Sequence, residues 1–429
     1  MGISIKRWMA AAAWMAAGPA LAAPTYIHAD RVIAVPGQPV RGASTIIVDA
    51  GRIVSIQNGH LAPPSGATAI DLRGKTVLPG LIDSHVHLSS DRGGEAGLLS
   101  FVREEPQMNA LEAQMNGMKT LRAGFTTVRN LGDEGATLAL REAIKRGWVQ
   151  GPRIVDAASS ISTTGGHMDG RGGLNDDLVA HLPSPENLCD GADDCRKVVR
   201  RQIDRGADVI KFATTGGVNS GTGLATRMNE EEAKALVETA HAYGRKVAVH
   251  AHGADGIKLA LRAGADSIEH GTVMDDEIVR TMKRQGTYYV PTLSTVNGYL
   301  ERLAADPNAY APDVKAQIDW RIGITGQSLA KAVPAGVRIA FGTDAGVSKH
   351  GRNADEFELL VKYGMTPVEA IKAATVNAAD LLGLSREVGT IEPGKSADLI
   401  AVTGDPIIDV KILKKVDFVM ARGKVVALD

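Results

Sequence analysis

The sequence has little cysteine, no dominant charge and, after its first residues, no long hydrophobic run. Its two cysteines, Cys189 and Cys195, are six positions apart and lack the further Cys or nearby His that would complete a four-ligand metal site. Lys and Arg total 48 against 49 Asp and Glu, and no Lys/Arg-rich run stands out. This balance argues against a nucleic-acid partner, which would require a basic stripe. No segment after residue 22 resembles a transmembrane helix, so no membrane span is expected in the mature chain.

The overall composition is that of an ordinary soluble globular protein, with 44% hydrophobic and 23% charged residues. At 429 residues the chain is long enough for one barrel-sized domain together with a smaller one. The 48 glycines suit a fold with many short turns between strands and helices.

The first 22 residues have the pattern of a secretory signal peptide. Lys6 and Arg7 precede a short apolar run over residues 8–17, and Ala20-Leu21-Ala22 forms an Ala-x-Ala cleavage site. The alternative is a membrane anchor, but the run is shorter than the ~20 residues that a span requires. We therefore expect export to the periplasm or the medium, where Cys189 and Cys195 would form a short disulfide loop.

The two ends of the chain are rich in β-branched runs separated by turns, which predicts one small β-sandwich domain built from residues 23–75 and 386–429. Between them, residues 76–385 alternate short apolar strands with helical patterns, one of which begins at the N-cap Asn229. This alternation predicts an α/β fold with a parallel (β/α)8 TIM-like barrel, and a doubly wound sheet is the alternative. The strands are expected at 77–81, 126–128, 153–157, 209–212, 247–249, 267–268, 288–290 and 339–341.

Histidine pairs follow two of these strands. His85 and His87 come after the first strand, and His250 and His252 end the fifth. Positions i and i+2 of a strand face the same way, so each pair of imidazoles should converge on one point. Neutral imidazoles placed in this way are typical metal ligands.

Further ligand types end other strands in the same region. Lys211 ends the fourth strand, His270 the sixth and Asp344 the eighth. In a barrel, the carboxyl ends of the strands surround one mouth, where active sites are built. Together these residues predict a metal centre, although each one alone has an ordinary structural explanation.

The order His-x-His, Lys, His, His, Asp resembles the amidohydrolase superfamily, in its subtype with a binuclear metal site and a carboxylated lysine. The runs at 77–83 and 389–399 also resemble motifs of that superfamily. Within it, Gly165-Gly166-His167 and the segment 250–253 are most similar to the imidazolonepropionase-like branch. That branch includes Xaa-Pro dipeptidases, carboxypeptidases acting on basic residues and ochratoxin-degrading amidohydrolases. The resemblance covers essentially the whole mature chain.

The resemblance implies two divalent metal ions, with Zn²⁺ best suited to an imidazole-rich site and Mn²⁺, Co²⁺ or Fe²⁺ left open. It implies that His85, His87 and Asp344 hold one metal and that His250 and His270 hold the other. Lys211 would bridge the two ions as a CO₂-derived carbamate. A hydroxide shared by the metals would attack the substrate carbonyl, and Asp344 would pass the proton to the leaving amine.

Three more residues are expected to contact the substrate. His252 faces the same way as His250 but exceeds the number of ligands needed, and His167 could polarise the carbonyl oxygen or hold a carboxylate. Ser89 follows the first ligand pair and is expected to line the pocket. The glycine-rich segment 214–221 lacks the Gly-Lys-Ser/Thr ending of a nucleotide-binding loop and is interpreted as a pocket wall.

The expected activity is hydrolysis of the amide bond of dipeptides or N-acyl amino acids, with ochratoxin-like aryl amides in that range. The resemblance also implies a homo-oligomer, with an octamer among the possible forms. One alternative is a mononuclear deaminase or a cyclic-amide hydrolase of the same superfamily; the deaminases lack the strand-four lysine and carry an acid soon after the strand-five histidine. An alternative of another class is an exported metal-binding or solute-binding protein, which needs no aspartate beside the metals.

Overall fold

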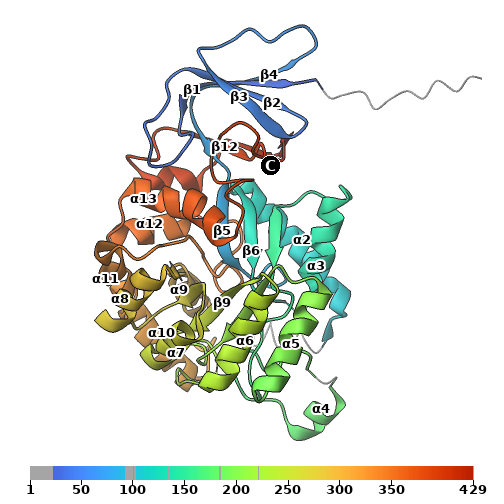
Figure 1. Ribbon diagram of the computed structural model, residues 1–429, viewed down its shortest axis with the longest axis vertical. Helices are drawn as coiled ribbons and strands as arrows, with labels where there is room; N and C mark the ends of the chain where they lie inside the picture. The colour runs from blue at the N-terminus through green and yellow to red at the C-terminus, as the bar shows by residue number, and fades with distance from the viewer. Residues whose placement is uncertain are drawn as a thin grey trace, which may run out of the picture.

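The computed structural model of the protein describes residues 23–91, 100, 103–133, 135–182, 185–220 and 222–428. The signal peptide expected at residues 1–22 lies outside these residues. Figure 1 shows a β-rich layer at one end of the long axis and a larger body of strands and helices at the other. Among the described residues, no helix combines the length and the hydrophobicity that crossing a membrane would require.

Both ends of the chain contribute to one seven-stranded sheet, in the order β14-β13-β12-β4-β1-β2-β3. The C-terminal part joins the N-terminal part where β12 runs antiparallel to β4, with Ile400 opposite Leu78. A cluster that includes Ile27, Val77 and Leu399 is buried against this sheet. The strands are β1 (Thr25–Val32), β2 (Ser44–Asp49), β3 (Arg52–Asn58), β4 (Thr68–Pro79), β12 (Leu399–Thr403), β13 (Phe418–Ala421) and β14 (Lys424–Val425).

The central body contains two parallel sheets in which each strand pairs with the next along the chain. One sheet holds β5 (Leu81–Val86), β6 (Phe125–Asn130) and β7 (Arg153–Asp156). The other holds β8 (Val209–Ala213), β9 (Lys246–Ala251), β10 (Ser267–His270) and β11 (Tyr288–Val290). Isolated parallel bridges connect Ile161 with Phe212, Tyr289 with Ile339, and Val86 with Ala345. The chain is therefore a mixed α/β fold with two parallel sheets, which also form single bridges to the segments that follow β7 and α11 (Gln327–Ala335).

Two predicted strands are corrected by the structure. Residues 77–79 belong to β4 of the terminal sheet, and the first parallel strand begins only at Leu81. The backbone changes partners at this point: the Gly80 amide donates to the carbonyl of Asp398, beside β12, at 2.8 Å, and the Leu81 amide donates to the carbonyl of Gly124, just before β6, at 3.0 Å. His85 therefore lies inside the first parallel strand. The strand expected at 339–341 is reduced to a bridge at Ile339, and a few residues later Asp344 has a φ of 55°, which is incompatible with an extended strand.

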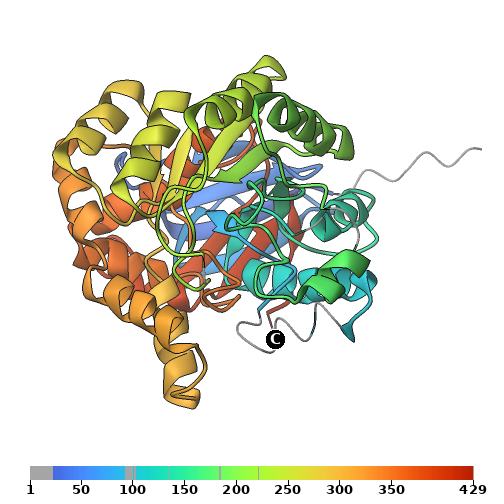
Figure 2. The same cartoon turned by 90° about the horizontal axis from the view of Figure 1, so that it is seen from below.

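Helices surround the parallel strands, as the view from below in Figure 2 shows. Asn229 caps α6 as expected: its side chain accepts from the Glu232 amide while the Glu232 side chain accepts from the Asn229 amide. The helices are α2 (Pro106–Arg122), α3 (Ala136–Lys145), α4 (Asp176–His181), α5 (Ala192–Arg205), α6 (Glu230–Ala242), α7 (Ala254–Ala263), α8 (Asp276–Gln285), α9 (Thr295–Ala305), α10 (Pro312–Gly323), α11 (Gln327–Ala335), α12 (Asp355–Lys362), α13 (Pro367–Lys372) and α14 (Ala378–Leu381), with a π-helical turn η1 (Ala373–Asn377) and a 3₁₀ turn η2 (Val410–Lys414).

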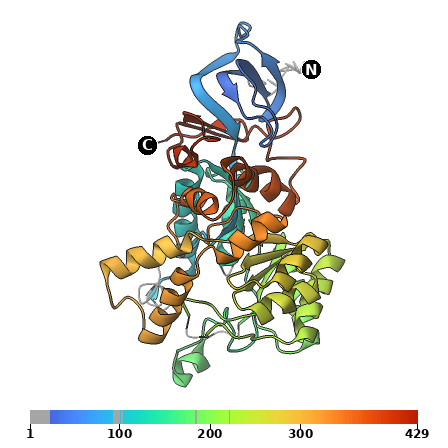
Figure 3. The same ribbon diagram turned by 90° about the vertical axis from the view of Figure 1, so that its left-hand side faces the viewer.

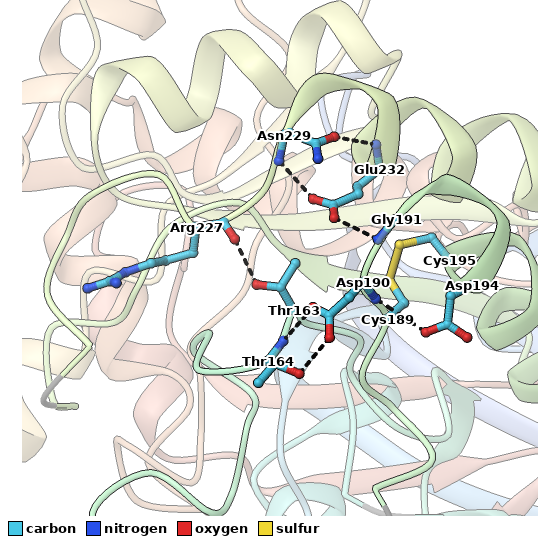
Figure 4. Close-up of a disulfide and its surroundings, with 10 residues drawn as sticks. All are labelled: Thr163, Thr164, Cys189, Asp190, Gly191, Asp194, Cys195, Arg227, Asn229 and Glu232. Atoms are coloured by element: carbon cyan, nitrogen blue, oxygen red, sulfur yellow. Dashed lines mark hydrogen bonds between the residues drawn. A yellow bond between two sulfur atoms is a disulfide. The ribbon is translucent and has the colours of Figure 1, made fainter.

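A disulfide closes the loop that leads into α5, because Cys189 and Cys195 are bonded to each other. Figure 4 shows how this loop supports the segment that follows β7. The Asp190 carboxylate accepts hydrogen bonds from the amide and the hydroxyl of Thr164, at 3.1 and 2.7 Å. The Gly191 amide donates to Glu232 at 2.8 Å. The disulfide loop thus ties the start of α6 to the segment that carries His167.

Candidate metal centre

The carboxyl ends of the parallel strands bring the predicted ligands together around one cavity of 160 Å³. His85 comes from β5, Lys211 from β8, His250 from β9 and His270 from the last position of β10. The cavity is lined by all seven residues that the sequence placed at strand ends: His85, His87, Lys211, His250, His252, His270 and Asp344.

One group of possible ligands consists of His85, His87 and Asp344. The Nε2 atoms of His85 and His87 lie 3.5 and 3.4 Å from the Oδ1 atom of Asp344. The Nδ1 atom of His87 donates to the carbonyl of Gly132 at 2.9 Å, which leaves its Nε2 lone pair free. Three donor atoms of the types that bind Zn²⁺ therefore meet at one point.

The second group consists of His250, His252 and His270, all of them buried. The Nε2 atom of His250 donates to the carbonyl of Gly216 at 3.1 Å, so its Nδ1 lone pair is free. The Nδ1 atoms of His252 and His270 bond to threonine hydroxyls at 2.7 and 2.8 Å. The ligand atoms of the three rings lie within 4.8 Å of one another, so His252 belongs to this group by position.

Lys211 contacts the first of these groups. Its Nζ atom lies 3.4 Å from the Nε2 atom of His85, and its side chain is 1% exposed. Burial lowers the pKa of Lys211 to about 8, against the opposing effects of Glu269 and Asp344. A buried lysine with a lowered pKa has a larger neutral fraction near neutral pH, and the neutral amine is the form that reacts with CO₂.

The backbone is strained at two candidate ligands. His270 has a φ of 69° and Asp344 a φ of 55°, which are left-handed conformations that non-glycine residues rarely adopt. His270 is the last residue of β10, Asp344 follows the bridge at Ile339, and both residues line the cavity. Strain of this kind persists where surrounding contacts over-determine it, and it is concentrated at functional sites.

Burial also keeps the histidines of the site neutral. The pKa values of His85, His250, His252 and His270 are held well below the usual value, chiefly by desolvation and further by nearby positive charge. Desolvation likewise raises the pKa of Asp344. Neutral imidazoles with a free nitrogen lone pair are the form that binds metal, so the residues present fit a pair of divalent cations.

Sequence reasoning missed a buried network behind His85. The Nδ1 atom of His85 donates to Glu269 at 2.8 Å, and the other oxygen of Glu269 accepts from Arg129, also at 2.8 Å. Ser267 donates to Glu269 at 2.5 Å, and Arg129 donates to the carbonyl of Ser84. The only sequence signal was a charged residue inside each of two apolar strands, Arg129 in β6 and Glu269 in β10.

A second missed residue is Asp83, which holds β5 against the segment that carries Asp344. Its carboxylate accepts from the Thr343 hydroxyl at 2.6 Å, the Thr343 amide at 3.1 Å and the Asn353 side chain at 2.8 Å. Burial raises the pKa of Asp83 to about 6. These bonds fix the backbone on either side of the His85 and Asp344 side chains.

Of the three residues predicted to contact the substrate, His167 and His252 line the cavity and Ser89 does not. His167 lines the cavity and stacks on His250, with ring centroids 4.2 Å apart. Gly217 of the predicted pocket wall covers it so closely that a Cβ would lie 2.1 Å from the His167 ring. Val218 and Asn219 also line the cavity, whereas Ser89 is half-buried and does not line it.

Two further features of the cavity were not expected from the sequence. Arg321 of α10 and Tyr299 of α9 form part of its wall. A larger hollow of 440 Å³ shares His87 and Met168 with the cavity and continues along Ser160 and Leu182. Figure 3 shows α9 and α10, drawn in gold and orange, projecting from the side of the body.

Comparisons with known proteins agree along nearly the whole chain. A sequence profile described as "Amidohydrolase family" matches residues 76–426. The ochratoxinase of Aspergillus niger is 31% identical over 421 residues, which cover 93% of this chain and 86% of that protein. The crystal structure of a Xaa-Pro dipeptidase with bound methionine in the active site is 41% identical, with a TM-score of 0.89 over 94% of this chain and 100% of that one. A prolidase complexed with N-methylphosphonate-L-proline is 30% identical, with a TM-score of 0.85 over 94% and 99%.

Proposed function

The chain belongs to the amidohydrolase family and is a hydrolase of amide or peptide bonds, and on this premise we propose that it cleaves dipeptides or N-acyl amino acids. The observation that carries the proposal is the pair of histidine-containing groups that share one cavity with the buried Lys211. The similar proteins are an ochratoxinase and Xaa-Pro dipeptidases, which support substrates of this class.

We propose that His85, His87 and Asp344 hold one divalent cation and that His250 and His270 hold a second, with carboxylated Lys211 between them. Two such cations, Zn²⁺ in this proposal, would supply Lewis acidity that polarises the substrate carbonyl and acidifies water. The short distance from Lys211 to His85 supports a role for Lys211 in the centre. A carbamate would provide two anionic oxygens where an ammonium would repel the cations.

His252 is better placed in contact with the substrate than in the metal shell. His85, His87, Asp344 and the Lys211 carbamate would already give the first cation four protein ligands, and adding His252 to His250, His270 and the carbamate would fill the shell of the second cation as well. Catalytic zinc sites keep a position open for water or substrate. Leaving His252 outside the shell preserves that position and directs a hydrogen-bonding ring towards the substrate.

Asp344 and His167 would act on the reacting atoms. We propose that Asp344 accepts a proton from the attacking water and delivers it to the amine nitrogen as the C–N bond breaks. Burial lowers the pKa of His167 to about 3, so its ring is neutral. A neutral imidazole can donate a hydrogen bond to a carbonyl oxygen but cannot neutralise a carboxylate, which favours the first of the two roles considered for it.

The finer fold and location are proposed on the same basis. The single bridges at Ile161, Ile339 and Ala345 support closure of the parallel strands into a (β/α)8 barrel, and the terminal sheet supports a small sandwich-like domain. The disulfide between Cys189 and Cys195 supports export to an oxidising compartment. A homo-oligomer stays a prediction.

The direct test is a substrate screen with purified protein. N-acyl amino acids, Xaa-Pro dipeptides, hydantoins and lactones would be assayed with and without chelator and bicarbonate. We expect amino-acid release from the first two classes, its loss after chelation, and recovery with divalent metal and bicarbonate. Turnover of hydantoins or lactones alone would favour the cyclic-amide alternative, and full activity after metal stripping would refute the metal centre.

A further inference from the structure

The outer face of α2 carries a row of exposed large apolar side chains. Met108, Leu111 and Met115 are 46%, 64% and 50% exposed, and their spacing of three and four residues places them on one side of the helix. The face that packs inward consists mainly of small or polar side chains, among them Ala113 and Gly117. A surface helix normally turns its large apolar residues towards the core. In α2 this arrangement is reversed, and we call the exposed row the α2 stripe.

An exposed tryptophan lies close to the same helix. Trp148 is 71% exposed in the turn that follows α3, and this turn contacts α2 because Gln114 donates to the carbonyl of Gln150 at 2.9 Å. Figure 1 shows α2 and α3 side by side, and the two helices are in contact. The other exposed large apolar residues of the described chain are distributed singly over separate elements and loops. Exposed apolar surface therefore gathers at α2, as it does at sites of protein association.

Charged residues of opposite sign flank the α2 stripe. Glu104 and Glu105 directly precede the helix, and Lys119 and Arg122 lie in its last turn. Lys119 also reaches Asp91 of its own chain at 3.7 Å, and its side chain is still 40% exposed. When two copies of α2 pack antiparallel, the acidic end of each helix meets the basic end of the other. This charge complementarity favours a second copy of the chain over a partner surface of uniform charge.

The stripe is also symmetric about its centre. Met108 and Met115 are equally distant in the sequence from the point between Leu111 and Glu112. A twofold axis through this point would place each Met108 opposite Met115 of the partner subunit and would bring the two Leu111 side chains together. The carboxylate of Glu112 accepts from the Asp91 amide of its own chain at 3.3 Å. Apolar side chains therefore occupy the centre of such a pair.

We propose that the α2 stripe is the centre of a twofold interface between two copies of this chain, with Trp148 at its edge. A specific interface buries about 800 Å² of each partner, so the charged ends of α2 and the turn after α3 form its polar rim. This inference is independent of the substrate. It also bears on the candidate metal centre, because Asn116 on the inner face of α2 donates to the carbonyl of Leu88, next to His87.

Analytical ultracentrifugation of the purified chain measures the association. At micromolar concentration we expect a dimer or a larger even-numbered assembly. Leu111→Arg should form an assembly of at most half the parent's mass, because two guanidiniums would meet at the twofold axis. Ile408→Arg is the matched control, since it places the same charge on an aliphatic side chain that is 79% exposed outside α2, and it should keep the parent's mass. A monomeric parent, or a Leu111→Arg variant with the parent's mass, would overturn the proposal.

Cysteine cross-linking tests the antiparallel geometry without disrupting the interface. The two natural cysteines are bonded to each other, so an introduced cysteine supplies the only free thiol. Under mild oxidation Leu111→Cys should form a disulfide-linked dimer. Met108→Cys should cross-link to Met115→Cys in a mixed sample more readily than to itself, and Ile408→Cys should stay uncross-linked. Equal cross-linking at Leu111 and Ile408 would reflect random collision and would refute the interface.

A vesicle assay separates self-association from membrane binding, which is the other use of an exposed apolar helix face. Vesicles of phosphatidylcholine and phosphatidylglycerol would be sedimented with the parent and with Leu111→Arg. We expect the parent to stay in the supernatant with its assembled mass. Co-sedimentation of a monomeric parent that Leu111→Arg abolishes would assign the α2 stripe to a membrane surface and refute the proposal. Hydrolase activity measured on the same samples keeps this outcome separate from a failure of the proposed function.

Discussion

Glu269 and His85 form a fully buried pair in which the carboxylate of Glu269 fixes the imidazole of a candidate metal ligand. The Nδ1 atom of His85 donates to Glu269 at 2.8 Å, so its Nε2 atom is directed towards Asp344 and Lys211. Arg129 holds the opposite oxygen of the carboxylate. This arrangement makes Glu269 a positioning residue for the candidate metal centre.

Replacement of Glu269 should weaken metal binding. In Glu269→Gln the fixed acceptor for His85 is lost and Arg129 loses its ion pair, so we expect metal affinity to fall by about 10- to 100-fold. A chelator titration followed by metal analysis measures this. Glu277→Gln is the control because that carboxylate is exposed and pairs with Lys258; equal chelator midpoints for both variants would contradict the role.

Lys211 should be essential for loading both cations. Lys211→Ala removes the proposed carbamate, and we expect the metal content to fall below two per chain, with activity reduced by several orders of magnitude. Acetate or propionate should restore part of the activity by supplying carboxylate oxygens in the vacated space. Lys246→Ala, at the start of β9 and away from the cavity, should keep full metal content.

His252 can be tested by counting metals. If it contacts the substrate, His252→Asn should bind as many cations as the parent while kcat/KM falls by about 10-fold or more. A matched His270→Asn should lose one cation, because His270 is assigned as a ligand. Loss of a cation in His252→Asn as well would place its ring in the metal shell.

The disulfide should contribute to stability and to the position of His167. Replacing Cys189 and Cys195 together with alanine should cost about 2 kcal/mol, the value expected for so short a loop. Denaturant unfolding with and without reductant measures the difference. Reductant should destabilise the parent by a similar amount and have no effect on the double variant; an equal response would show that the bond does not form in solution.

Glu356 should make stability depend on pH. Burial raises its pKa to about 7 from the ordinary value of 4.5, although the amides of Leu293 and Ser294 donate to it. The folded state therefore holds the proton more tightly. The associated stability is fully present below pH 4.5 and is lost as the pH rises through 7.

The glutamine side chain in Glu356→Gln cannot ionise, so this variant should not lose stability as the pH rises through 7. The melting temperature of the parent should fall relative to that of the variant as the pH rises from 4.5 to 7. Glu358→Gln is the control, since that carboxylate pairs with Lys414 in a half-exposed ion pair. A constant difference between parent and Glu356→Gln across this range would exclude the ionisation of Glu356 as the cause.

Much of the candidate site could be predicted from the sequence because its signals are local. The His-x-His pairs converge through the two-residue repeat of a strand, and Lys211, His270 and Asp344 follow apolar runs whose ends meet in a parallel fold. The structure places all of them around one cavity. The cysteine pair was equally readable, because its members are only six positions apart in the sequence.

The ends of the strands were less predictable because they depend on backbone pairing with segments that are distant in the sequence. The apolar run at 77–81 continues through two sheets, and the boundary is set by hydrogen-bond partners far along the chain, Asp398 for the Gly80 amide and Gly124 for the Leu81 amide. The run at 339–341 has the composition of a strand, yet its pairing is reduced to one bridge before the turn at Asp344.

The sequence by itself determined which chemistry is present: the types of ligand, their order along the chain and the class of reaction. Tertiary structure alone decided which groups support that chemistry. It places Glu269 behind His85 and Arg321 in the cavity wall, although nothing near either residue in the sequence indicates a partner. The physical reason is that secondary-structure periodicity fixes the direction of neighbouring side chains, whereas contacts between distant residues arise only when whole elements pack.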